Sequence, residues 1–135
     1  MRLPLCALAC LILAAPALAQ ADAAPALSLE LNRVDPLDGA CRLTFMAENG
    51  FDTGLEALSL ETVLIDTEGR VERLTLFDFG ALPAGVPRVR QFDIPGLDCA
   101  ALGRVLINGV SECGGSQDCG GALRLNSRSD VEVIG

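Results

Sequence analysis

The sequence predicts an all-β protein, a single antiparallel β-sandwich of immunoglobulin-like type with about seven strands. Three observations lead to this prediction. Segments in which apolar and polar residues alternate recur along the chain, turn residues separate them at short intervals, and no convincing helical pattern follows residue 19. A small β-barrel is the alternative, because periodicity alone does not separate the two architectures. The roughly 116 residues after residue 19 fit one domain with one core.

The first two strands are predicted from residues 27 to 48. Leu27, Leu29 and Leu31 share one face of the first strand, and the turn residues at 35–39 are expected to end it. The second strand is the clearest, and its inward face is expected to contain Cys41, Leu43, Phe45 and Ala47.

The middle of the chain predicts a hairpin followed by a crossing between sheets. Leu58 to Ile65 is apolar on both faces, which is typical of a central strand. Asp66 to Gly69 indicates a hairpin turn that ends in a left-handed Gly, and the partner strand is expected from Arg70 to Phe79. Gly80 to Pro87 is too rich in Gly and Pro for a central strand, so we expect it to cross between sheets.

The last third of the chain predicts the remaining strands. Arg88 to Ile94 and Arg104 to Val110 are the fifth and sixth, with a turn at residues 95–99 between them. A Gly-rich loop from Cys113 to Cys119 leads to the final segment. There, residues of one parity from Leu123 to Val133 predict one long closing strand or two strands in line.

The stretch from Leu58 to Ile94 carries a resemblance to known modules. It combines a strand, a D-T-E-G hairpin, an L-F-D-F strand, an L-P-A-G crossover and an R-V-R-Q-F-D-I strand. In these it resembles the small bacterial FxLYD-type β-sandwich modules. Over its mature length, including the placement of Cys41, Cys99 and Cys113, the chain is also similar to small exported alphaproteobacterial β-sandwich proteins of unknown function. The resemblance implies a fold and a compartment, and it brings no catalytic residues.

The first 19 residues are typical of an export signal. Arg2 precedes an apolar run from Leu3 to Leu13, and Ala17-Leu18-Ala19 is the small-x-small pattern that signal peptidase cuts. We expect cleavage before Gln20, a flexible lead-in at residues 20–26 and the β-sandwich domain at 27–135. Because no segment reaches the ~20 apolar residues of a membrane span, the prediction is a periplasmic protein without membrane insertion.

Four of the six cysteines remain after the two in the signal are removed. Four cysteines in an oxidising compartment allow three pairings. The short Gly-rich segment between Cys113 and Cys119 favours their pairing, which leaves Cys41 with Cys99. Structural disulfides are predicted, because no C-x-x-C is present and the spacings suit neither a zinc site nor a redox pair.

Composition limits the chemistry that the chain can perform. There is no His, Lys, Tyr or Trp, and all ten basic residues are Arg. The sequence therefore provides no Ser–His or Cys–His pair and no Schiff-base lysine. Loss of Arg2 with the signal leaves nine Arg against 18 acidic residues, and a net charge of −9 makes nucleic acid a poor partner. We expect no cofactor and no metal, since the acidic turns do not match a calcium loop.

These observations favour a non-catalytic binding or interaction module, an accessory subunit of an envelope complex whose partner is a periplasmic or envelope protein. No catalytic residue is assigned. Arg88 and Arg90, which share a strand face, are the candidate binding residues, beside an edge strand that accepts a partner strand. The alternatives are a carboxylate-based hydrolase acting on a saccharide and a protease inhibitor. Gly114 and Gly115 disfavour the inhibitor, because a bait loop gains affinity from rigidity.

Overall fold

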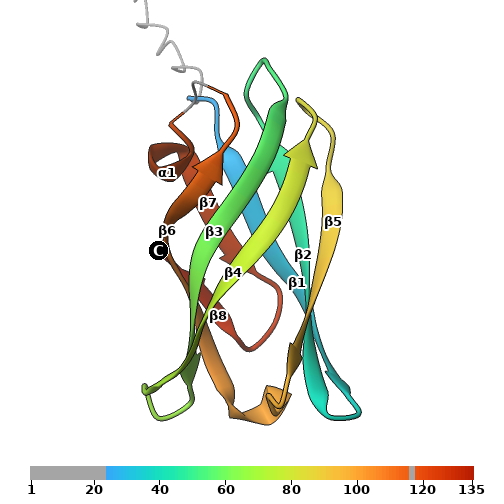
Figure 1. Ribbon diagram of the computed structural model, residues 1–135, viewed down its shortest axis with the longest axis vertical. Coiled ribbons are helices and arrows are strands. Elements are labelled where there is room, and N and C mark those ends of the chain that lie inside the picture. The colour runs from blue at the N-terminus through green and yellow to red at the C-terminus, as the bar shows by residue number, and fades with distance from the viewer. Residues whose placement is uncertain (1–23, 116–117) are drawn as a thin grey trace, which may run out of the picture.

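The computed structural model describes residues 24–115 and 118–135, so the predicted signal at 1–19 and the start of the lead-in lie outside the described residues. Eight strands form two four-stranded sheets that pack face to face (Figure 1). Two hydrogen-bonded sheets, rather than one closed sheet, make the described part a sandwich and not a barrel. The predicted all-β sandwich is thereby confirmed.

The two sheets are named here by their strands, given in spatial order. Sheet I consists of β5 (Arg88–Pro95), β2 (Ala40–Asn49), β1 (Leu27–Leu37) and β7 (Leu123–Ser127). Sheet II consists of β4 (Val71–Leu82), β3 (Leu55–Asp66), β6 (Leu102–Cys113) and β8 (Glu132–Ile134). Two short helices lie in the connections, η1 (Cys99–Ala101) and α1 (Cys119–Ala122).

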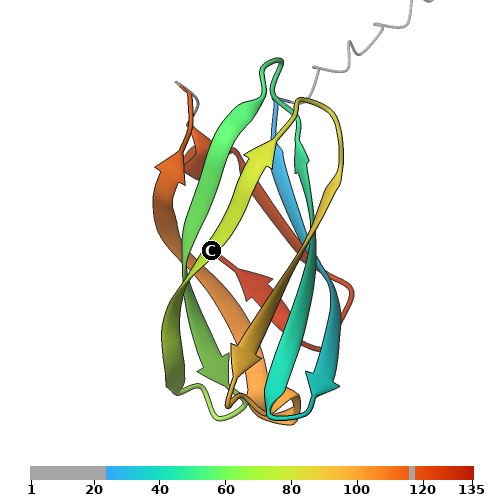
Figure 2. The ribbon, with the colours of Figure 1, turned by 45° about the vertical axis from the view of Figure 1, so that its right-hand side comes forward.

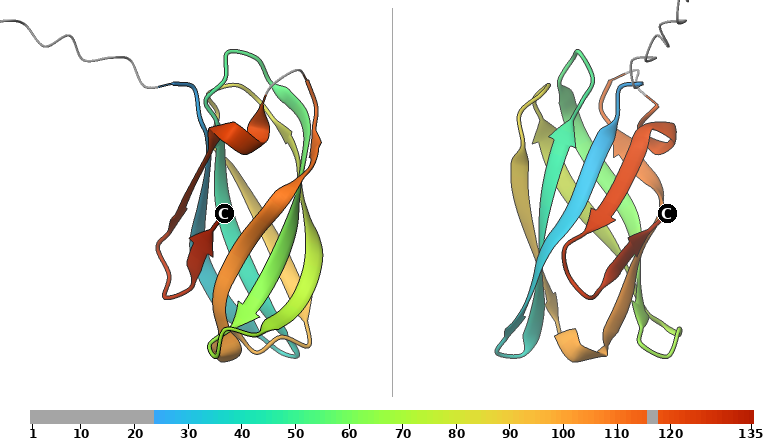
Figure 3. Two further views of the ribbon diagram at one scale, coloured as in Figure 1. Left: turned by 90° about the vertical axis from the view of Figure 1, so that its left-hand side faces the viewer. Right: turned by 180° about the vertical axis from the view of Figure 1, so that it is seen from behind.

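The sequence predicted an antiparallel sandwich, but each sheet contains both antiparallel and parallel strand pairs. The pairs β1–β7 and β6–β8 are parallel, and both involve the C-terminal segment. That segment forms two strands in different sheets, so the prediction of strands in line was wrong (Figure 3). Ser127 Oγ donates to Val131 O at 2.6 Å and accepts from Ser129 N at 3.1 Å. These side-chain bonds reverse the chain in the middle of an unbroken alternating pattern.

Strand β1 extends beyond the position where turn residues were expected to end it. It continues through Pro36 to Leu37 and joins β2 across Asp38 and Gly39. Proline is tolerated there because β7 pairs only with Leu27–Leu31, so no strand adjoins β1 on that side at Pro36.

Strand β4 also extends further than predicted. Gly80 to Leu82 belong to this strand, and the crossing to sheet I is reduced to residues 83–87 (Figure 2). Leu82 is fully buried, and its carbonyl oxygen accepts a hydrogen bond from Asn49 Nδ2 at 3.0 Å. Burial and this bond hold the segment in the sheet despite its glycine.

The core lies between the inner faces of the sheets. The inward residues predicted for β2 are all fully buried: Cys41, Leu43, Phe45 and Ala47. Phe45 meets Phe77, Phe79 and Phe92 edge-on, and the rings of Phe77 and Phe92 stack at 4.2 Å between centroids. Strand β3 pairs with β4 and β6 and is the central strand that its pattern predicted.

Both predicted disulfides are present. Cys41 of β2 is bonded to Cys99 of η1, and Cys113 at the end of β6 is bonded to Cys119 of α1. Disulfides of this kind form in oxidising compartments outside the cytoplasm. None of the helices in the described residues is long and apolar enough to cross a membrane.

Candidate functional site

The predicted binding residues Arg88 and Arg90 lie on β5, at the side of the sandwich where β5 and β4 are the outermost strands. Arg90 Nε donates to Phe79 O at 2.7 Å, and Arg90 Nη2 donates to Ala81 O at 3.1 Å. Both carbonyls belong to β4, so Arg90 bridges sheet I to sheet II. Arg88 Nη1 donates to the carbonyl of the preceding residue at 3.2 Å.

A second arginine crosses the same gap in the opposite direction. Arg73 Nη1 of β4 donates to Pro95 O of β5 at 2.8 Å. Unpaired backbone groups at a sheet edge can accept an added strand, and charged side chains over the edge hinder this. The arginines of β4 and β5 thus occupy carbonyls that strand addition would require.

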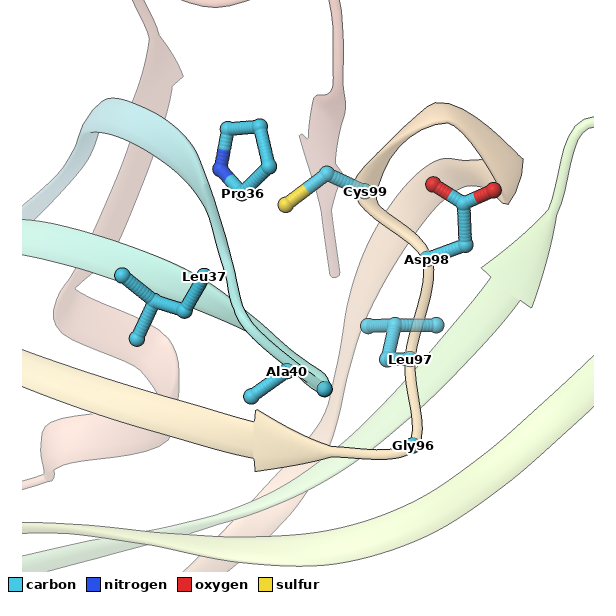
Figure 4. A pocket seen from close by; sticks show the side chains of 8 residues that line it. Pro36, Leu37, Ala40, Gly96, Leu97, Asp98 and Cys99 are labelled. Atoms are coloured by element: carbon cyan, nitrogen blue, oxygen red, sulfur yellow. The ribbon is translucent and has the colours of Figure 1, made fainter.

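Two hollows lie at the end of the sandwich that contains η1. The first, of about 320 Å³, lies between the β1–β2 turn and residues 96–99 (Figure 4). Its one carboxylate, Asp98, accepts a hydrogen bond from Ala100 N at 3.0 Å and caps η1. The second, of about 560 Å³, includes Arg128, whose Nε donates to Glu30 Oε1 at 2.9 Å. These polar groups serve the fold.

The outer face of sheet I is mainly polar, and several of its charged groups pair with one another. Its exposed apolar residues are Met46 and Val89, which face each other in register and are 40% and 54% exposed. Arg42 of β2 and Asp93 of β5 face each other in register, with Nε–Oδ1 at 2.7 Å and Nη2–Oδ2 at 2.9 Å. The hydrogen bond from Arg42 lowers the pKa of the Asp93 carboxyl, and the same bond raises the pKa of Arg42.

Glu30 of β1 organises the other half of this face. It accepts hydrogen bonds from Asn32 at 3.0 Å, Asn126 at 3.1 Å and Arg128 at 2.9 Å. The bond from Asn32, followed by that from Arg128, lowers the pKa of the Glu30 carboxyl. Glu30 and Asp93 therefore both have partners within the fold, whereas Glu48 on the same face has no hydrogen bond or ion pair within the described residues.

The outer face of sheet II, which is turned toward the viewer in Figure 1, carries more apolar residues. The register places one outward apolar residue from each strand in a row across the sheet, called here the apolar row: Leu74, Val63, Leu106 and Ile134. Leu74 is 71% exposed, and Leu76, two residues further along β4, is 53% exposed. Val63 is only 7% exposed and forms the floor between them and β6.

A hollow of about 350 Å³ opens over Val63, called here the face hollow. Its lining includes Glu61, Leu74, Leu76 and Asn108. Glu61 Oε2 lies 3.4 Å from the point where a Cβ of residue 109 would stand, so Gly109 leaves room for the carboxylate. Within residues 24–115 and 118–135, the side chains of Glu61 and Asn108 have no hydrogen bond or ion pair.

The charged residues around the apolar row are mainly acidic. The outward positions of sheet II carry Glu61, Glu72, Asp78, Arg104, Glu112 and Glu132. Arg104 is the single cation in this set, and its Nε lies 3.3 Å from Glu132 Oε2. Glu72 Oε2 lies 3.5 Å from Nε of the adjacent Arg73. The face thus combines exposed leucines with an excess of negative charge.

This face was not predicted from the sequence, where residues 70–79 were expected only as the partner of a central strand. The signal was nonetheless present, because Leu74 and Leu76 have the opposite parity to Phe77 and Phe79, which makes the strand apolar on both faces. On a strand at the edge of a sandwich, such a pattern leaves one apolar face in solvent.

The comparisons with known proteins leave the site to be interpreted from its geometry. A scan against protein-family models and searches of the curated proteins and the solved structures find no match to this chain. In the described part of the chain, no group of three or more Cys, Asp or Glu side chains is arranged to hold a metal ion.

Proposed function

We propose that the protein is a periplasmic, non-catalytic binding module that docks onto an envelope protein through the outer face of sheet II. The observation that carries this proposal is the exposure of Leu74 and Leu76 on β4, where Leu74 begins the apolar row that crosses all four strands. Contiguous exposed apolar surface marks interaction sites. Covering the part of each leucine that remains exposed contributes about 1–2 kcal/mol, so the pair supplies a useful part of a binding energy.

Export to the periplasm is supported by two independent features. The disulfides Cys41–Cys99 and Cys113–Cys119 require an oxidising compartment. The sequence of residues 1–19 has the pattern of a cleaved signal. An accessory subunit of an envelope complex meets its partners in this compartment.

The use of the aromatic and acidic side chains favours binding over saccharide hydrolysis. A saccharide cleft needs aromatic walls and two facing carboxylates. Phe45, Phe77, Phe79 and Phe92 pack against one another between the sheets. The face hollow is lined by a single carboxylate, that of Glu61.

Site-specific photo-crosslinking in intact cells tests the proposal. A photoreactive residue at Leu74 is compared with one at Gln91, which is exposed on the outer face of sheet I. We expect the probe at 74 to label one envelope protein, and the label to disappear when Leu76→Asp is added. Equal labelling from 74 and 91, or labelling that survives Leu76→Asp, contradicts docking through sheet II.

A further inference from the structure

The face hollow also indicates what kind of partner surface fits it. Resting on the docking function proposed above, we propose that the partner presents a cationic, apolar segment: an apolar side chain enters the hollow, and an adjacent Arg or Lys pairs with Glu61. The segment belongs to another protein rather than to a second copy of this chain.

The shape of the hollow fits a side chain from a protein surface. Val63 forms a nearly buried floor, and Leu74 and Leu76 form exposed walls. The apolar row continues beyond the hollow across β6 to Ile134 on β8. A small molecule would cover the hollow alone, whereas a protein segment also covers the row, as anchor residues do at protein interfaces.

Glu61 determines the charge that the segment must carry. Its carboxylate lines the hollow and has no ion pair within the described residues. An apolar partner alone would therefore remove the water that hydrates the carboxylate and supply no hydrogen-bond donor in its place. An unpaired carboxylate is costly to cover, and a cation placed beside it offsets that cost. Gly109 keeps the space next to the carboxylate open. Asp78, exposed on the neighbouring strand, adds a second negative charge.

A second copy of the chain lacks the required cations. Its outer face of sheet II would bring five acidic residues against the same set, and of these only Glu72 and Glu132 are paired within the described residues, with Arg73 and Arg104. Like charges that face each other across an interface oppose association and suppress the wrong partner. The whole chain is also acidic, with a formal net charge of −8. Charge complementarity therefore selects a basic partner.

A charge-graded peptide series tests this inference by fluorescence anisotropy at low and at physiological salt. The probes are three labelled peptides of equal length in which Leu alternates with Arg, with Gln or with Glu. We expect the Leu/Arg peptide to bind, the Leu/Gln peptide to bind about tenfold more weakly and the Leu/Glu peptide not to bind. Raising the salt concentration should weaken the Leu/Arg complex most.

Paired variants separate local from general charge effects. Glu61→Gln with Asp78→Asn should weaken binding of the Leu/Arg peptide about tenfold and flatten its salt dependence. Glu48→Gln with Asp52→Asn makes the same change in net charge away from sheet II and should leave affinity within about twofold. If both pairs weaken binding equally, the attraction is general and the inference is overturned.

Two further outcomes distinguish this inference from the docking function itself. Equal binding of the Leu/Arg and Leu/Gln peptides, with both lost in Leu74→Ser with Leu76→Ser, overturns the cationic segment and leaves docking through sheet II in place. Retention of peptide binding in the double Ser variant, together with a crosslink from residue 74 that survives Leu76→Asp, overturns both. A dimer in analytical ultracentrifugation that the double Ser variant abolishes identifies a second copy as the occupant and also overturns the inference.

Discussion

Sheets I and II share one core but present opposite outer surfaces to solvent. On sheet I, Arg42 pairs with Asp93 and Glu30 with Arg128. On sheet II, Leu74 and Leu76 are exposed beside Glu61, which has no partner within the described residues. Both faces belong to strands with equally well buried inner sides, so the requirements of the core do not explain the difference.

The comparison shows which surface residues serve the fold. A charge that finds its partner within the chain contributes to holding strands together, as Arg90 does between β5 and β4. An exposed leucine gains nothing from the folded state unless another surface covers it. The outer face of sheet II is therefore the part of the molecule whose composition is best explained by a partner.

The largest effect is expected for a pair of neighbours on β4 that point in opposite directions. Phe77 is 1% exposed and packs in the phenylalanine cluster, so Phe77→Ala should lower the free energy of unfolding by about 3–5 kcal/mol. Leu76→Ala, at an exposed position, should change it by less than about 0.5 kcal/mol. Urea unfolding followed by circular dichroism measures both. A large loss of stability in Leu76→Ala would mean that the outer face has a structural role.

The disulfides extend the comparison, because one begins in a strand of each sheet. Cys41–Cys99 spans a sequence separation of 58 and Cys113–Cys119 one of 6. In the chain-entropy model, the longer loop contributes about 4 kcal/mol and the shorter about 2 kcal/mol to the free energy of unfolding. Double Cys→Ser variants of each pair, measured by urea unfolding, should differ in this order. The reverse order would place the main covalent constraint in the loop after β6.

Arg90 and Arg88 provide a smaller test of how the sheets are joined. Arg90→Ala removes two hydrogen bonds to carbonyls of β4 and should lower the free energy of unfolding by about 1–2 kcal/mol. Arg88→Ala removes one bond to an adjacent residue and should change it by less than about 0.5 kcal/mol. Thermal unfolding of both variants measures the difference. Unchanged stability in Arg90→Ala would restore Arg90 as a residue available to a partner.

Much of the fold could be predicted because local pattern and core burial agree. The inward residues of β2, the Asp66–Gly69 hairpin, the central position of β3 and both disulfides follow from parity and spacing alone. Errors arose where tertiary contacts override local signals. Pro36 continues a strand because no neighbour pairs with that part of β1, and serine side-chain bonds reverse the chain after Ser127.

The candidate site was harder to predict, because it depends on which strands become neighbours. Leu74, Val63, Leu106 and Ile134 are far apart in the sequence and become one row only through the register of sheet II. The role of Arg90 likewise depends on two carbonyls of another strand. Alternation identifies the faces of a strand, but it does not show which face remains exposed when strands from two sheets are assembled.

The smallest expected effect concerns the paired charges of sheet I. Because Arg42 lowers the pKa of the Asp93 carboxyl in the folded protein, this pair contributes stability above the usual carboxyl pKa. That contribution is lost as the pH falls through the lowered pKa. The same sign holds for Glu30, whose pKa is also lowered. Nuclear magnetic resonance of the carboxyl carbons at decreasing pH measures both values.

The variant Arg42→Gln makes this measurement specific to the pair. It should return the Asp93 pKa toward its usual range and leave that of Glu30 unchanged, since Glu30 is held by Asn32 and Arg128 instead. The acid-induced loss of stability should become slightly smaller in this variant, because one carboxylate no longer gains a partner on folding. An Asp93 carboxyl that titrates identically with and without Arg42 would mean that Asp93 gains no more from the fold than Glu61 of sheet II does, and the contrast between the faces would then rest on the leucines alone.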